Sequence, residues 1–288
     1  MTSENLLYLL LSVSFTSGRN IASKKTADDN SAMSHFFFSQ AMLFLAAAIL
    51  LISFSITSIS AISTVTLIYG IIYGVLLISS QWMFTLALKI GSTSICSVIY
   101  SLGFIIPTVS GALFWDEEFT ITDLFGLILA LATIALTVIG KEKGTSNGKS
   151  FLLPIIIAML SSGGLGIMQK VQQGSAFANE RNEFLIIAFV LAFLASIIGF
   201  FACNSKAEIQ KRNVIFPSLA GLCFGGANVF NTILAGRIKS AAFFPLQNIS
   251  VILLSTLLGI ILFKEKLSFK NIMIIILGII TVTVFSIY

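Results

Sequence analysis

The chain has 288 residues, of which 57% are hydrophobic and 10% are charged, and its formal net charge is +5. An average soluble domain is about 45–50% apolar and about 25% charged, and a chain with so few ionic groups would expose large apolar patches to water. The composition therefore excludes an ordinary soluble enzyme and favours an integral membrane protein, whose basic charge reflects membrane electrostatics and gives no sign of nucleic-acid binding.

Long apolar runs recur along the whole chain and are separated by short polar breaks. A helix that spans a bilayer needs about 20 mostly apolar residues, whereas the strands of a membrane barrel are short and alternating. We do not expect the first run to be a cleaved signal peptide, because Glu4 stands where basic residues would be expected. The runs predict an all-α fold of ten transmembrane helices at 5–24, 34–56, 64–88, 92–115, 121–140, 151–172, 184–203, 215–236, 241–263 and 270–288.

Lysine and arginine are unevenly shared between the two ends of these predicted helices. With Arg19 and Lys89 assigned to their nearest loops, one side carries 13 of the 17 basic residues and the other carries 4. The positive-inside rule places the basic loops in the cytoplasm. We therefore expect a multi-pass protein of the plasma membrane with both termini outside.

The two halves of the chain carry similar landmarks in the same order. Glu117 and Glu265 lie 148 positions apart, at matching helix ends. The third and eighth helices each carry a glycine pair that allows close packing or sliding of helices, Gly70/Gly74 and Gly221/Gly225. Five helices per half send the second half through the membrane in the opposite sense. The halves 1–140 and 151–288, joined by the hydrophilic linker 141–150, are thus predicted to form an inverted repeat.

An apolar helix that ends in Glu-x-(Leu/Phe)-(Ser/Thr) occurs in both halves, at Glu117–Thr120 and Glu265–Ser268. Together with the small, serine-rich end of the first helix, this pattern resembles the drug/metabolite transporter superfamily and, within it, the EamA-type proteins of ten helices. The resemblance covers the whole chain. It implies a small metabolite as cargo and a central cavity lined by the third, fourth, eighth and ninth helices. One departure is that Ile274 stands where the pattern, kept by Gly126 in the first half, has glycine.

The carboxylates are all expected in loops or at helix ends. Glu117 and Glu265 are either proton or substrate sites, or structural caps at the start of the following helix, where a negative charge meets free N–H groups. Their repetition in both halves favours caps. Small multidrug-resistance proteins of the same superfamily exchange protons at a buried glutamate, and the lack of such a candidate here disfavours a proton-coupled pump for polycations.

Neutral polar and aromatic side chains interrupt the apolar segments. They favour a polar, partly aromatic cavity for a small zwitterion or polyol, although interhelical hydrogen bonding would use the same groups. The substrate-binding candidates are Tyr73, Gln81, Trp82, Tyr100, Gln169, Asn228, Asn231, Gln247 and Asn248. Arg19 either contacts an anionic group or snorkels to the cytoplasmic surface.

Residues that carry catalytic or metal chemistry are sparse. The single histidine and the three isolated cysteines show no spacing for a metal site or a disulfide, and a membrane enzyme would need grouped acids or histidines. We therefore expect no cofactor and no enzymatic activity. The predicted function is a secondary transporter, an exporter or exchanger of small metabolites such as amino acids, working by alternating access between the two five-helix halves. A non-transporting scaffold or receptor is the alternative, the small-molecule substrate and the lipid bilayer are the expected partners, and a homodimer is left open.

Overall fold

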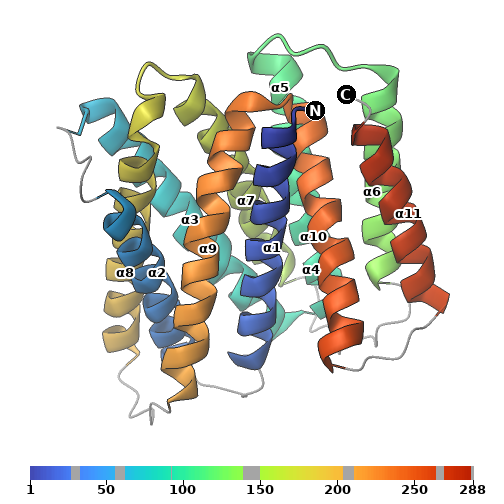
Figure 1. Cartoon of the computed structure of the whole chain (residues 1–288). Helices are drawn as coiled ribbons and strands as arrows, with labels where there is room; N and C mark the ends of the chain where they lie inside the picture. The colour runs from blue at the N-terminus through green and yellow to red at the C-terminus, as the bar shows by residue number, and fades with distance from the viewer. Residues whose placement is uncertain are drawn as a thin grey trace. The chain divides into compact units, whose positions relative to one another are not determined.

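The computed structural model describes residues 1–26, 33–55, 62–91, 93–138, 150–203, 211–263 and 269–286. In these residues all regular structure is helical, and no strand occurs (Figure 1). The α-helices are α1 (Ser3–Thr26), α2 (Met33–Ser55), α3 (Thr64–Ile90), α4 (Thr93–Ser101), α5 (Ile105–Phe114), α6 (Ile121–Val138), α7 (Leu152–Gly174), α8 (Arg181–Ala202), α9 (Arg212–Arg237), α10 (Ser240–Phe263) and α11 (Phe269–Ser286). Two 3-10 turns, η1 (Leu102–Phe104) and η2 (Ala178–Glu180), complete the order.

The helices follow the apolar runs of the sequence closely. Because α4, η1 and α5 follow one another without a break, each of the ten predicted segments corresponds to one described stretch of helix. Within the described residues, seven stretches are long and apolar enough to cross a membrane, and two shorter apolar ones lie in α6 and α11. The prediction of an all-helical, multi-span membrane protein is thus confirmed. The inverted relation of two five-helix repeats stays a prediction.

Contacts divide the chain into two compact units. Unit 1 comprises Met1–Leu6, Ser79–Gln169 and Leu234–Tyr288, and unit 2 comprises Leu7–Ile78 and Lys170–Ile233. Each unit therefore takes segments from both predicted halves. The predicted repeat boundaries remain a statement about sequence, and all but the last residue of the linker 141–150 lies outside the described residues.

In unit 2, α2 and α8 lie side by side (Figure 1). Their interface is close because alanines alternate with aromatic rings, and Ala41, Ala47 and Ala188 are all fully buried. The ring centroids of Phe44 and Phe189 are 6.5 Å apart. Such offset aromatic pairs add about 0.5–1.5 kcal/mol beyond the area that they bury, so this cluster forms the core of unit 2.

The glycine pair on α3 brings that helix close to α8. A Cβ added at Gly70 would lie 2.8 Å from Ile187 and 3.0 Å from the carbonyl oxygen of Phe184. A Cβ at Gly74 would lie 3.1 Å from the carbonyl oxygen of Ala188. These distances leave no room for a larger residue without movement of the helices, as expected of small residues spaced four apart in membrane helices.

The glycine pair on α9 packs against α2 with the same geometry. A Cβ at Gly221 would lie 2.1 Å from the carbonyl oxygen of Leu43, and one at Gly225 would lie 3.3 Å from that of Ala47. In both pairs the first glycine faces a carbonyl oxygen and the second faces the alanine four residues further on. The third predicted helix therefore packs on the seventh much as the eighth packs on the second.

In unit 1, α10 packs against α5, α6 and α11, and α6 also packs against α11. The ring of Phe285 near the end of α11 lies against Gly126 of α6, where an added Cβ would come within 2.5 Å of the ring. Gly126 thus makes room for this ring. At the matching position of the second half, Ile274 is buried.

Candidate functional site

Hydroxyl groups pair between three helices of unit 1. The hydroxyls of Tyr100 on α4 and Ser80 on α3 lie 2.9 Å apart and share a hydrogen bond. On α7, the hydroxyl of Ser161 donates to that of Ser79 on α3 at 3.0 Å. The ring of Tyr100 also lies 4.4 Å from that of Phe84, between centroids. Because a hydroxyl has one donor and two acceptor positions, one hydrogen bond does not use the full capacity of either pair.

Two predicted amides lie next to each other on α10. The side-chain amide of Asn248 donates to the carbonyl oxygen of Phe244 at 3.0 Å, and Gln247 is 8% exposed. Pro245 lies inside the helix and supplies no backbone N–H, which weakens the hydrogen-bond ladder at this point. The other candidates in unit 1 are half-buried or buried, namely Gln81, Trp82 and Gln169.

The candidates of unit 2 use their polar groups within that unit. Tyr73 and Asn228 are 1% and 4% exposed, and the Tyr73 hydroxyl donates to Asn228 Oδ1 at 2.6 Å. Asn228 in turn donates to the carbonyl oxygen of Phe224 at 2.8 Å. The hydroxyl of Ser12 donates to Asn231 Oδ1. These bonds join α3 and α1 to α9, which is the interhelical role that the sequence left open beside the binding role.

Arg19 lies over an aromatic ring of unit 2. Its guanidinium carbon is 4.1 Å from the ring centroid of Phe224, well within the range of a cation–π interaction. The side chain is half-buried. This stacking holds the guanidinium against α9, and the choice between an anion contact and snorkelling remains a prediction.

Glu117 lies at the start of a helix that is distant in sequence. Its carboxylate accepts a hydrogen bond of 2.7 Å from the backbone N–H of Ser240, the first residue of α10. The chain reaches this position through Asp116, whose φ of 50° is left-handed. It also passes over Gly111, where an added Cβ would lie 2.1 Å from Glu117 Oε2. The matching residue Glu265 lies outside the described residues.

The start of α6, where the sequence placed Glu117, is capped by other residues. Asp123 Oδ2 accepts hydrogen bonds from the backbone N–H of Thr120 at 2.8 Å and from its hydroxyl at 2.7 Å. The backbone N–H of Asp123 donates to the Thr120 hydroxyl at 3.2 Å. This reciprocal arrangement is a capping box, and it leaves the Glu117 carboxylate available for α10.

Sequence reasoning missed the serines that pair with predicted candidates, Ser12, Ser79, Ser80 and Ser161. Hydroxyls in helices can bond the carbonyl four residues earlier, as Thr108 does to Phe104 at 2.7 Å. The serines that instead reach another helix look the same in sequence. Only the helix packing separates the two kinds.

Together, apolar helices of membrane-spanning length and buried neutral amides and hydroxyls define a multi-span membrane protein with a polar interior. The sequence profile of the family described as "Sugar transport protein" matches residues 43–288. Because this is most of the chain, the chain belongs to that family and is a membrane transporter. The family is of the drug/metabolite type that the resemblance indicated. Assignment to the EamA-type branch stays a prediction.

Solved structures share the fold. One, titled "Crystal structure of protein", superposes with a TM-score of 0.83 at 15% sequence identity, covering 100% of this chain and 98% of its own. In total, 28 chains match. At this identity the likeness shows the fold alone. No curated protein matches the chain.

Proposed function

We propose that this transporter carries a small, uncharged, hydroxylated metabolite, a sugar or polyol, across the plasma membrane. The observation that carries the proposal is the match of residues 43–288 to the sugar transport family. The predicted cargo class of amino acids is the second choice, since it comes from the resemblance alone.

The chemistry of the polar set in unit 1 supports a neutral solute. Its side chains are amides, hydroxyls and an indole, which offer both donors and acceptors without a fixed charge. A sugar hydroxyl also needs both a donor and an acceptor. The half-buried Tyr100, whose hydroxyl is held by the fully buried Ser80, and Asn248 on α10 are the residues that we propose to contact the solute.

We propose alternating access as the mechanism, with outward transport or exchange as its direction. The two glycine contacts of unit 2, α3 on α8 and α9 on α2, support the inverted repeat on which this mechanism rests, because they repeat the same contact geometry in the two halves. In repeats of this kind, one set of helices rocks against another around a fixed binding site.

A thermal-shift screen of the detergent-purified full chain tests the proposal. A ligand that binds only the folded state stabilises it by about 2.7 kcal/mol at a concentration of a hundred times Kd. Neutral sugars and polyols are expected to raise the melting temperature more than amino acids or organic cations do. No shift from any sugar at millimolar concentration would favour the alternative, a non-transporting scaffold or receptor.

Two variants and a matched control tie the shift to the proposed residues. Asn248→Ala and Tyr100→Phe are expected to remove most of the sugar-induced shift. Asn20→Ala makes the same chemical change at an exposed position of α1 and should leave the shift intact. An equal loss in all three variants would contradict the assignment of these residues.

A further inference from the structure

The guanidinium group of Arg19 lies in the middle of unit 2, far from the ends of the helix that it contacts. Its carbon is 4.1 Å from the ring centroid of Phe224, and Phe224 lies halfway along the 26 residues of α9. At about 1.5 Å of rise per residue, the ring is about 19 Å from either end of α9. Because α9 is long and apolar enough to span a bilayer, the charge of Arg19 lies near the level of the bilayer centre.

Arg19 belongs to the stripe of α1 that faces α9. The stripe consists of Tyr8, Ser12, Phe15 and Arg19, whose partners on α9 are Phe230, Asn231, Gly226 and Phe224, respectively. Leu6 and Leu10, which are 49% and 57% exposed, lie on the opposite face of α1. The guanidinium is therefore directed toward the neighbouring helix and away from the exposed apolar face, and it is half-buried there.

Two further phenylalanine rings hold the partner ring of Arg19 in place. The centroid of Phe224 lies 6.5 Å from that of Phe44 on α2 and 5.6 Å from that of Phe189 on α8. A fixed ring also fixes the guanidinium that lies over it. The N–H donors of a guanidinium lie in its plane, whereas a cation–π contact uses the charge of the whole group. Arg19 can therefore stay on the ring while its N–H groups donate hydrogen bonds.

A cation at this depth needs a reason, because charged side chains inside a membrane are costly and those that occur mark solute or ion pathways. The described carboxylates all lie in the first turn of a helix or in a connection between helices, at Glu4, Asp116, Glu117, Glu118, Asp123, Glu180 and Glu183. Snorkelling toward the end of α1 at Thr26 would lower the cost. However, helical side chains tilt toward the N-terminus of their helix, and the contact with Phe224 favours a position away from Thr26.

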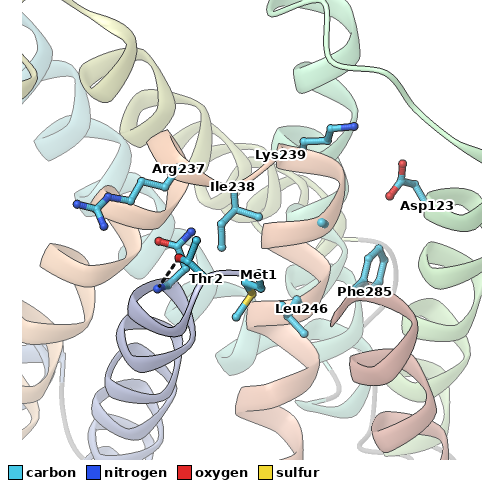
Figure 2. A pocket seen from close by; sticks show the side chains of 10 residues that line it. Met1, Thr2, Asp123, Arg237, Ile238, Lys239, Leu246 and Phe285 are labelled. Atoms are coloured by element: carbon cyan, nitrogen blue, oxygen red, sulfur yellow. Dashed lines mark hydrogen bonds between the residues drawn. The ribbon is translucent and has the colours of Figure 1, made fainter. Parts of the chain in front are cut away.

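Arg237 shows the ordinary setting of a basic residue in this chain. It is the last residue of α9, and its side chain is 43% exposed and forms an ion pair of 2.8 Å with Glu4. Together with the first residues of the chain, Lys239 and Asp123, it lines a cavity of about 540 Å³ in unit 1 (Figure 2). At a helix end, water and lipid headgroups can solvate such a charge. The position of Arg237 therefore requires no solute to explain it.

We propose that Arg19 contacts the transported solute and selects it by charge. The inference rests on the proposed function and deepens it, because it concerns the same solute. The guanidinium donates hydrogen bonds to hydroxyl or carboxylate oxygens, and its positive charge repels a cationic solute in the way that an arginine excludes cations from some pores. The accepted class extends from neutral sugars to sugar acids, and amino sugars are rejected.

Counterflow in vesicles that contain the full chain tests this selection with three sugars of similar size. Glucose is neutral, glucuronate is negative, and glucosamine is positive at mildly acidic pH. The unaltered protein is expected to accumulate labelled glucose and labelled glucuronate and to exclude labelled glucosamine. Equal accumulation of glucosamine and glucose would overturn the inference and leave the proposed function intact.

Three variants tie the selection to Arg19. Arg19→Met removes the charge and should lower the accumulation of glucuronate relative to glucose by about tenfold or more, the effect of one charged hydrogen bond. It should also admit glucosamine. Arg19→Lys keeps the charge and should still exclude glucosamine. Arg237→Met makes the same chemical change as the first variant at a helix end and should leave the order of the three sugars unchanged.

The remaining outcomes separate a binding role from a packing role. If Arg19→Met changes the accumulation of glucose and glucuronate by the same factor and still excludes glucosamine, Arg19 only packs α1 on α9 and the inference is wrong. Arg19→Gln replaces the methionine variant if thermal unfolding shows that the latter is not folded. Accumulation of glucuronate without glucose would overturn the proposed uncharged cargo and support the role of Arg19. Accumulation of none of the three sugars would overturn both proposals.

Discussion

Among single residues, Gly111, Asp116 and Glu117 form a short connection between α5 and α10. The Glu117 carboxylate places a negative charge at the first N–H of α10, where the helix dipole favours it. This geometry requires a left-handed backbone at Asp116 and leaves no room for a side chain at position 111, which is glycine. Each of the three therefore has a structural task in the contact with α10.

This connection predicts opposite changes in stability for substitutions at Gly111 and at Asp116. Gly111→Ala should destabilise the protein by about 1–3 kcal/mol, because the new methyl group would overlap the Glu117 carboxylate. Asp116→Gly should stabilise it by up to about 1 kcal/mol, because glycine adopts the left-handed conformation without a steric penalty. Thermal unfolding in detergent measures both, and two changes of the same sign would contradict the described connection.

The pair of Tyr73 and Asn228 separates a packing role from a binding role. Tyr73→Phe removes a buried interhelical hydrogen bond and should lower stability by about 0.6 kcal/mol, the average for such bonds in membranes. Solute affinity should change little. If affinity falls sharply at unchanged stability, Tyr73 contacts the solute instead. Tyr100→Phe, which removes a hydroxyl bonded to Ser80, is the matched comparison.

At the scale of helices, the glycine contacts predict which positions tolerate a methyl group. Gly221→Ala should destabilise unit 2 by about 1–3 kcal/mol or more, because the added Cβ would meet the carbonyl oxygen of Leu43 on α2 and a backbone cannot move aside. Gly225→Ala, one turn away, adds a Cβ at 3.3 Å from its nearest neighbours. It should destabilise unit 2 less, by about 1 kcal/mol or below, because the overlap with the Ala47 backbone is only a few tenths of an ångström and alanine restricts the unfolded chain. Urea or thermal unfolding of the two variants measures the difference, and equal effects would contradict the described approach of α9 to α2.

Helix positions could be predicted closely from the sequence, and helix partners could not. Apolar runs mark where a chain enters and leaves a membrane, so α3 and α10 begin and end within two residues of expectation. The glycine pairs also marked close contacts, although not which helix would be the partner. The Glu117 carboxylate was expected to cap the following helix, and it caps α10 instead. The sequence could not distinguish the two, because a glutamate looks the same whether it caps a helix four residues away or one 123 positions away.

The sequence could predict which kinds of residue form the candidate site, but not which of them bond one another. Polar residues in apolar helices indicate internal hydrogen bonds or a cavity; hydrogen bonds occur at several candidates, and the binding role stays a prediction. Tyr73 and Asn228 bond each other, whereas Tyr100 pairs with Ser80, which no pattern distinguished from the serines that bond their own helix. The sequence did not predict the cavity of about 540 Å³ in unit 1, because the segments that line it are far apart in the sequence.

For the whole molecule, the predicted orientation in the membrane can be tested at helix ends that lie close together in the structure. Within unit 1, the first residues and Lys239 line one cavity, while Gly91 after α3 contacts Phe151 before α7. The alternation of helices assigns these two groups to opposite sides, the first outside. In a chain without its native cysteines, Lys239→Cys should react with a membrane-impermeant maleimide in intact cells. Lys89→Cys should react only after permeabilisation, and the reverse pattern would invert the predicted orientation.

Solute counterflow in reconstituted vesicles tests the central claim most directly. Vesicles that contain the full chain are loaded with an unlabelled neutral sugar and diluted into a trace of the same sugar carrying a radiolabel. A transporter of uncharged hydroxylated solutes should accumulate the label transiently above its external concentration, and protein-free vesicles should not. If correctly folded protein gives no accumulation with any neutral sugar or polyol, the chain does not carry this class of solute.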